Sequence, residues 1–271
     1  EARITGDYMY YDKAAMQQVN KVLKNTPDDL EALTYKALIY LSQHHFADGL
    51  ATAQQIEKLN NFYAFNYGIL VDANVEMGNY KEAVSSADKM VSIRPDLQSY
   101  SRISYLREIH GDYAGAIEAM QSAVEAGMPG DEATEWSRVQ LGHLYENTGD
   151  IKRAEMEYTI AQQERPGYAF ALAGLGRIAS YNKDYKNAIN YFERADSSTN
   201  DYSFKEQLAA LYFKIGNKEK GKELIEKVID GMNNDSKKGK EDESIGHYAD
   251  RELATAYLMT GDFDKALDHA L

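Results

Sequence analysis

The chain holds two short segments whose residue types bind nucleotides or metals in other proteins, and both have simpler explanations. Gly174-Leu175-Gly176 matches part of a nucleotide-binding glycine fingerprint, but it lies inside a predicted helix with no strand before it. The histidines His44 and His45 offer imidazole ligands, but neighbours in sequence point to different faces of a helix. A turn explains this pair better than a metal site does.

Residues 233–243 form a polar insertion that faintly resembles a calcium-binding loop. The alternate ligands of such a loop would be Asn233, Asp235 and Lys237, and an ammonium group cannot ligate a cation. The segment carries charges of both signs and no apolar residue, so its composition predicts a solvated, mobile loop.

No other arrangement of residues predicts catalysis. The sequence has no glycine-rich loop ending in Gly-Lys-Ser/Thr, no His-Glu-x-x-His segment and no cysteine. Its histidines are scattered and define no Ser/His/Asp arrangement. We therefore expect a protein that is not an enzyme, with no catalytic residue, cofactor or metal ligand.

The elements that must position any functional residue follow from a repeat. A glycine followed by Asp or Asn recurs along the chain, and two looser copies fill the gaps. Most steps between the copies are 33 or 34 residues, a period of about 34 being typical of stacked helix-turn-helix solenoids, which bind other molecules rather than transform them. The repeats' turns start at His44, Gly78, Gly111, Gly149, Lys183, Gly216 and Gly261.

Each repeat also carries small residues at fixed places after its turn. The fifth residue after the turn start is Ala or Gly, and a second small or apolar residue follows seven later, on the same face of a helix. Small side chains there allow two helices to pack closely. The fifth positions are Gly49, Ala83, Ala116, Ala154, Ala188, Gly221 and Ala266, and the later ones are Ile56, Met90, Ala123, Ala161, Ala195 and Val228.

The turn glycines and the prolines mark helix ends. Glycine takes the left-handed conformation that ends a first helix, and the Asp or Asn after it can cap the second. The prolines fall between one repeat's second helix and the next repeat's first, where they interrupt no helix. They are Pro27, Pro95, Pro129 and Pro166.

This pattern resembles the tetratricopeptide-repeat family over nearly the whole chain. The family's turn glycine, aromatic residue, alanine, proline and first-helix Leu-Gly pair recur in register. The matching residues are Gly78, Tyr80, Ala83 and Pro95 in one repeat, Gly149, Ala154 and Pro166 in another, and Leu141-Gly142, Leu175-Gly176 and Tyr145 in first helices.

The resemblance implies an all-α fold, a right-handed superhelical solenoid of stacked helix-turn-helix repeats that forms a single domain over residues 1–271. The chain is expected to begin and end inside a repeat. The expected units are a partial repeat at 8–29, repeats near 30–63, 64–96, 97–134, 135–168, 169–201 and 202–246, and a partial repeat at 247–271.

Net charge and hydropathy restrict which partners and which cellular compartments are expected. The net charge of −13 disfavours nucleic acid and anionic membrane surfaces, both of which attract basic proteins. No apolar stretch approaches the length of a membrane span. The style of the repeats is similar to bacterial members of the family, so we expect a soluble protein of the bacterial cytoplasm or periplasm, with the choice between these open.

The resemblance further implies that the first helices line a concave groove that receives a peptide or another protein. Some of its rings can instead pack against the neighbouring repeat. Trp136 is either a binding anchor or a cover for the insertion at 127–134, packed on Met128. Arg138 occupies the family's packing-tryptophan position. The expected groove residues are Phe65, Asp72, Gln98, Tyr105, Trp136, His143, Phe170, Arg177 and Tyr181.

The charges at the inward positions predict a neutral or basic partner, because acidic residues outnumber basic ones there. Some chaperone co-factors of the family clamp an acidic tail with Lys, Arg and Asn. The corresponding positions here are Thr34, Leu38, Gly68 and Asp72, which predict no such clamp.

Three functional hypotheses follow. The first is a non-enzymatic scaffold that binds a peptide or protein in the concave groove. The second is a regulatory or substrate-recruiting segment of a larger enzyme or of a transcriptional or signalling regulator. The third is self-association through unfinished repeats at the two ends.

Overall fold

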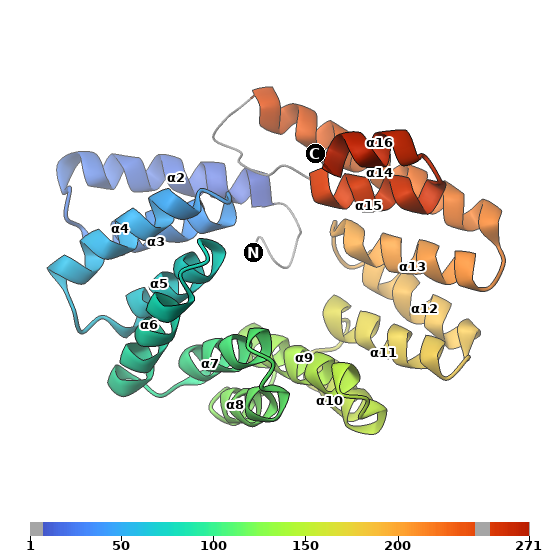
Figure 1. Cartoon of the computed structure of the whole chain (residues 1–271), viewed down its shortest axis with the longest axis horizontal. Coiled ribbons are helices and arrows are strands. Elements are labelled where there is room, and N and C mark those ends of the chain that lie inside the picture. Colours follow the sequence, from blue (N-terminus) through green and yellow to red (C-terminus); the bar gives the residue numbers. More distant parts are fainter. Residues whose placement is uncertain (1–7, 242–249, 271) are drawn as a thin grey trace. The chain divides into compact units, whose positions relative to one another are not determined.

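The computed structural model describes residues 8–241 and 250–270, which form fifteen helices and no strand (Figure 1). The all-α expectation is therefore confirmed for the described residues. The helices are α2 (Tyr8–Asn25), α3 (Leu30–Ser42), α4 (Phe46–Leu59), α5 (Ala64–Glu76), α6 (Tyr80–Ile93), α7 (Leu97–Ile109), α8 (Tyr113–Glu125), α9 (Glu132–Asn147), α10 (Ile151–Glu164), α11 (Ala169–Tyr181), α12 (Tyr185–Asp196), α13 (Tyr202–Lys214), α14 (Lys218–Glu241), α15 (Asp250–Thr260) and α16 (Phe263–Ala270).

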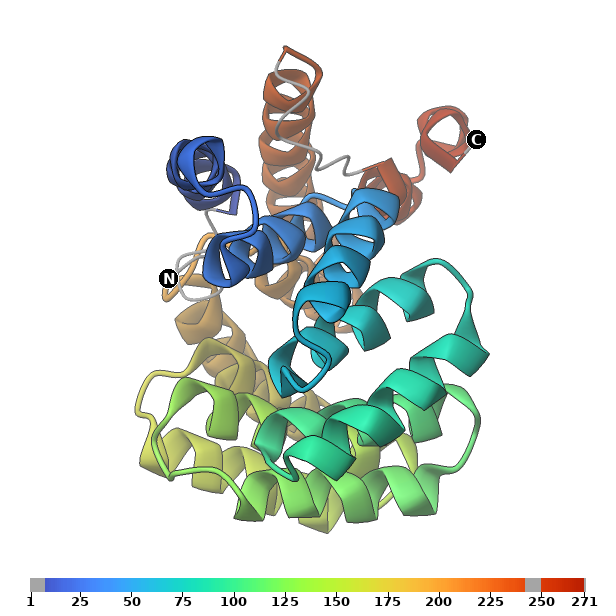
Figure 2. The same ribbon diagram turned by 90° about the vertical axis from the view of Figure 1, so that its left-hand side faces the viewer.

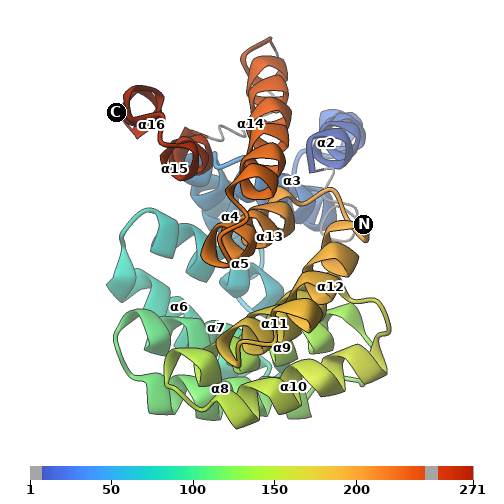
Figure 3. The same ribbon diagram turned by 90° about the vertical axis from the view of Figure 1, so that its right-hand side faces the viewer.

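From α3 onward the helices alternate between the first and the second helix of a repeat, so the odd-numbered helices are first helices. The chain forms two compact units. The N-terminal unit comprises Tyr8–Arg165 with α2–α10, and the C-terminal unit runs from Pro166 with α11–α16. Within each unit, successive helix pairs stack side by side (Figures 2 and 3). That the two units form one domain stays a prediction.

The turns inside the repeats have the left-handed geometry expected of them. The residue at each of the seven turn starts has a positive φ, from 60° at His44 to 86° at Gly216. At Gly78 the following amide, that of Asn79, donates to the carbonyl of Asn74 at 2.8 Å and closes the end of α5. All four prolines lie between helices, as the sequence predicts.

Two of these turns are made without glycine, at His44 and Lys183. A side chain in the left-handed region costs about 1–2 kcal/mol, partly offset because glycine loses more entropy on folding. We expect Lys183→Gly to raise the free energy of unfolding by about 0.5–1 kcal/mol, measured by urea denaturation. The control Lys186→Gly, inside α12 and exposed, should lower it by about 0.5–1 kcal/mol. If both variants lower the free energy of unfolding, the left-handed conformation of Lys183 is not strained.

The small residues after the turns form the contact between paired helices. Ala83, Ala116, Ala154 and Ala188 are 0% exposed, and the apolar residues seven positions later are also buried. Glycine at this position allows a still closer approach. A Cβ on Gly49 would lie 2.8 Å from Leu41 Cδ2, so the Leu41 side chain would have to move to accommodate it.

The N-terminal unit buries a triad of charged residues between α9 and α10, which we call the Arg138 triad: Glu135, Arg138 and Glu157. Glu135 is 0% exposed and accepts a hydrogen bond from the Gly130 amide at 2.9 Å. Arg138 donates from Nε to Glu135 Oε2 at 3.2 Å and from Nη1 to Glu157 Oε2 at 3.0 Å. An ion-paired guanidinium therefore occupies the position that the resemblance gives to a packing tryptophan.

The expectation of a solvated loop at 233–243 is wrong for its described part, because residues 233–241 continue α14. Ile229, Met232 and Ser236 are buried and follow helical spacing, so the buried face persists beyond the polar boundary seen in sequence. Asp235 accepts a hydrogen bond from the Tyr202 hydroxyl at 3.0 Å. Residues 242–243 lie outside the described residues.

Candidate functional site

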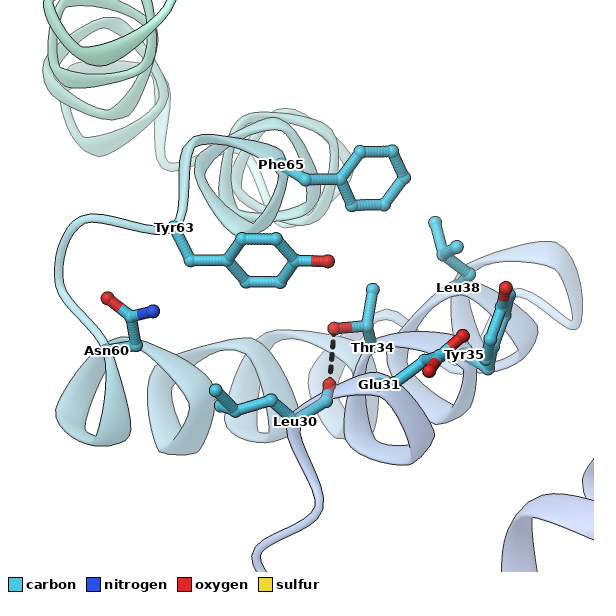
Figure 4. A pocket seen from close by; sticks show the side chains of 8 residues that line it. All are labelled: Leu30, Glu31, Thr34, Tyr35, Leu38, Asn60, Tyr63 and Phe65. Atoms are coloured by element: carbon cyan, nitrogen blue, oxygen red, sulfur yellow. Dashed lines mark hydrogen bonds between the residues drawn. The ribbon is translucent and has the colours of Figure 1, made fainter.

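An open pocket of about 490 Å³ lies in the N-terminal unit between one face of α3 and the start of α5 (Figure 4). Two first helices therefore meet at this pocket, together with the loop that leads into α5. The pocket is lined by Leu30, Glu31, Thr34, Tyr35, Leu38, Asn60, Tyr63 and Phe65.

Helical spacing explains the α3 wall of the pocket. Glu31, Thr34, Tyr35 and Leu38 recur at intervals of three and four residues, so their side chains leave the same face of α3. The hydroxyl of Thr34 donates to the Leu30 carbonyl at 2.6 Å, which satisfies this buried group inside the helix. Tyr35 is 51% exposed and remains available to a ligand.

Two stacked rings form the opposite wall of the pocket. The rings of Tyr63 and Phe65 lie 6.2 Å apart between centroids, with 29° between their planes. Phe65, one of the expected groove residues, is 36% exposed. The pocket thus combines aromatic and aliphatic surface with one carboxylate, Glu31, and one amide, Asn60. This lining suits an apolar side chain of a partner better than a reacting group.

Arg102 of α7 links α7 to α5 and forms hydrogen bonds with two of the expected groove residues, Asp72 and Gln98. Its Nε donates to Asp72 Oδ1 at 2.9 Å and its Nη2 to Oδ2 at 2.7 Å, a bidentate pair. Its Nη1 donates to Gln98 Oε1 at 3.2 Å. The guanidinium lies against Gly68, where a Cβ would be 2.9 Å from Arg102 Cζ. The charge of Asp72 is therefore offset by a residue that the sequence analysis did not include in the groove.

At the other end of α5, Tyr105 of α7 lies among carboxylates. The Tyr105 side chain is 45% exposed. Burial of its phenol, and then the charges of Glu76 and Glu108 among others, raise the pKa of Tyr105. Within residues 8–241 and 250–270, neither Glu76 nor Glu108 forms an ion pair. We call Glu76, Tyr105 and Glu108 the acidic patch.

The remaining expected groove residues of the N-terminal unit lie on α9, and both are half-buried. The ring of His143 packs edge-on against Tyr158, with 5.9 Å between centroids. Trp136 is also partly covered. Met128, its suggested packing partner, is 71% exposed and is not part of the core.

In the C-terminal unit the three expected residues lie on α11 and differ in their surroundings. Phe170 packs edge-on against Phe204 of α13, with 5.3 Å between centroids, so this ring does contact the next repeat. Arg177 donates to Gln207 Oε1 at 3.2 Å. Tyr181 is 67% exposed. That these residues continue a groove from the N-terminal unit stays a prediction.

The C-terminal unit also contains a carboxyl group with a raised pKa. Burial, followed by the charges of Glu252 and Asp201, raises the pKa of Glu206 to about 7. Its Oε1 atom is buried and has no hydrogen-bond partner among the described residues. The protonated form of Glu206 is therefore favoured by folding.

We expect this carboxyl group to make stability depend on pH. Because the pKa of Glu206 is raised from 4.5 to about 7 in the folded state, its stabilising effect is complete below about pH 4.5 and is lost as the pH rises through about 7. Glu206→Gln should reduce the loss of stability between about pH 5 and about pH 8, measured by urea denaturation. The exposed control Glu219→Gln should leave it unchanged. Equal pH dependence in wild type and Glu206→Gln would refute the assignment.

Two general observations bear on chemistry and membranes. Among the described residues, no group of three or more His, Cys, Asp or Glu is arranged to hold a metal ion. In the same part of the chain, no helix combines the length and the apolar character needed to cross a bilayer.

Comparison with known proteins shows which folds this chain is similar to. A family model described as a tetratricopeptide repeat matches residues 171–202, and no curated protein matches the chain. PilW, described as a widely conserved type IV pilus biogenesis factor, is similar over 73% of this chain and 91% of its own, with 14% identity and a TM-score of 0.61.

Two larger solved structures are similar over almost the whole chain. A human IFIT1 dimer with PPP-AAAA covers 95% of this chain and 66% of its own, with 15% identity and a TM-score of 0.62. The APC/C hetero-tetramer Cut9–Hcn1 covers 94% of this chain, with 16% identity and a TM-score of 0.59. The chain spans only 48% of the length of that structure's chain.

The helix pairs, the left-handed turns and these matches together define a helical-repeat solenoid. Residues 171–202, which cover most of α11 and all of α12, are a tetratricopeptide repeat. The chain therefore contains a tetratricopeptide repeat within a helical-repeat solenoid, a fold that builds extended binding surfaces.

Proposed function

We propose that the chain is a non-enzymatic scaffold that binds an extended segment of another protein along its first helices. In the N-terminal unit the binding surface is the first-helix face, formed by the pocket, the Asp72–Arg102 pair and the acidic patch on α3, α5 and α7. The observation that carries this proposal is the open pocket of about 490 Å³ between two first helices.

Exposed aromatic side chains support this choice of surface. Tyr35, Phe65 and Tyr105 are 51%, 36% and 45% exposed and come from three successive first helices. Aromatic rings offer a large contact area while losing little conformational freedom, and they dominate the energetics of many interfaces. Their exposure on one face is therefore more informative than exposure of single apolar residues elsewhere.

Charge supports a neutral or basic protein as the partner. The chain has a net charge of −13, and Glu31, Glu76 and Glu108 contribute carboxylates to the first-helix face. An acidic segment or a nucleic-acid phosphate would be repelled there.

Binding measurements on single variants test the proposal. A partner identified by affinity pull-down and mass spectrometry would be purified, and its affinity measured by titration calorimetry. Phe65→Ala and Tyr105→Ala should each weaken binding by about tenfold or more, as expected for aromatic anchors. Trp136→Ala tests whether the surface extends to α9.

The matched control is Tyr113→Ala, which removes a ring of similar exposure, 43%, from the second helix α8. It should leave the affinity unchanged. Circular dichroism of every variant would exclude unfolding as the cause. If Phe65→Ala and Tyr105→Ala bind the partner as wild type does, the site is not on the first-helix face.

A further inference from the structure

The pocket and the acidic patch lie at opposite ends of the same helix. Phe65, at the pocket, is the second residue of α5, and Glu76 is its last. Eleven residues separate them, which is about 16 Å along a helix and a rotation that returns to within about 20° of the same direction. Both features therefore belong to one stripe of α5, with α3 beside one end and α7 beside the other.

The pocket end of this stripe is suited to an apolar side chain. Its walls are mostly rings and aliphatic groups, and the Thr34 hydroxyl is satisfied by its own helix. A partner side chain that enters the pocket therefore does not leave the buried Thr34 hydroxyl without a hydrogen bond.

The patch end is suited to a cation. The phenol of Tyr105 is 45% exposed and lies close enough to Glu76 and Glu108 to feel the charges of both. Neither carboxylate has an ion-pair partner in the described part of the chain. An ammonium or guanidinium group can contact both the carboxylates and the face of the ring. The two arginines of α7 are engaged elsewhere, since Arg107 pairs with Asp112 at 3.6 Å and Arg102 with Asp72.

The middle of the stripe carries no net charge of its own. Asp72, between the two ends, is neutralised by its bidentate pair with Arg102. The attraction for a cation is therefore confined to the end of α5 and fixes one position of the bound segment.

Resting on the proposed function, we propose that the bound segment carries a large apolar side chain for the pocket and a lysine or arginine for the acidic patch. An extended chain advances about 3.3 Å per residue, so the distance of about 16 Å separates the two by about five residues. The partner is thus a basic segment with an apolar anchor at a fixed spacing.

Selection from a library of random peptides tests this inference. The peptides are displayed on phage and are about twelve residues long, which is sufficient to span both ends of α5. The immobilised targets are the whole chain, the pocket variant Tyr35→Ala/Phe65→Ala and the patch variant Glu76→Gln/Glu108→Gln. The control is Glu82→Gln/Glu118→Gln, which removes two exposed carboxylates from the second helices α6 and α8. Circular dichroism verifies that each variant is folded.

We expect enriched peptides that share an apolar residue and a Lys or Arg about five positions apart. Their affinity should fall roughly tenfold in the patch variant, less so at high salt, and should be unchanged in the control. Pocket-dependent peptides with no basic residue, or with one at another spacing, would overturn this inference and leave the proposed function standing. If no enriched peptide depends on Tyr35 and Phe65, both proposals fail.

Discussion

Replacing Arg138 with methionine is expected to lower the free energy of unfolding by about 3–5 kcal/mol, the usual cost of removing one member of a buried ion pair. Arg138 is only 14% exposed in its side chain, and it forms ion pairs with two carboxylates whose side chains are 0% and 9% exposed. Without the guanidinium, Glu135 and Glu157 would be buried close together with no cation between them. Urea denaturation followed by circular dichroism at 222 nm, a standard helical wavelength, measures the effect.

The triple variant Arg138→Met/Glu135→Gln/Glu157→Gln tests why Arg138→Met destabilises the protein. The cause is either the two carboxylates left without a cation or the lost packing of the arginine side chain. The triple variant removes all three charges and keeps a carbonyl oxygen to accept the Gly130 amide. We expect it to regain most of the lost stability. The exposed control Arg94→Met breaks a surface ion pair with Asp96 and should cost less than about 1 kcal/mol. A single variant Arg138→Met as stable as wild type would show that the triad contributes nothing.

Introducing a charged side chain at the contact between paired helices is expected to cost at least about 2 kcal/mol, because it adds both volume and an unpaired charge to a close-packed site. Ala154→Arg tests α10 and Ala188→Glu tests α12, and both alanines are 0% exposed. The matched controls are Glu155→Arg and Asn190→Glu, which are exposed positions on the same two helices.

Thermal and urea denaturation of the four variants would measure these effects, and the controls should lie within about 0.5 kcal/mol of wild type. Asn187 is also exposed but is a poorer control, because its side chain donates to Asp184 at 2.6 Å. Wild-type stability in Ala188→Glu would mean that α12 tolerates a charge at its closest contact, contrary to the packing described above.

The repeat period predicted the backbone of the turns better than residue type alone. His44 and Lys183 are unsuited to a left-handed conformation, yet both adopt it, because each stands where the period requires a turn. Composition failed at residues 233–241, where it predicted a loop but α14 continues. Asn233 and Asp235 are polar and are typical of a loop, but their partners Tyr257 and Tyr202 lie 24 and 33 residues away in sequence.

The sequence predicted which positions of the candidate site lie on first helices, but it did not predict which side chains form ion pairs there. Spacing assigned Phe65 and Tyr105 to first helices, and both are exposed there. The pair between Arg102 and Asp72 was missed because it joins residues thirty positions apart, although Gly68 offered a signal, being one period before Arg102. Tyr35 was not predicted, because the inward positions that the resemblance implies on this helix are Thr34 and Leu38.

The Arg138 triad also has a consequence for how repeats can be exchanged. A stack of nearly equivalent units can fold with one unit docked in the place of another, and only differences between units prevent this. Arg138 and Glu135 both lie on α9, but Glu157 lies on α10, so only the pairing of these two helices completes the triad. Against an alanine-lined neighbour Arg138 would lose one of its two ion pairs, and Glu157 packed against another helix would be a buried carboxylate without Arg138. The triad therefore specifies which second helix α9 packs against. Recombination or design that moves α9 to another position must transfer α10 with it.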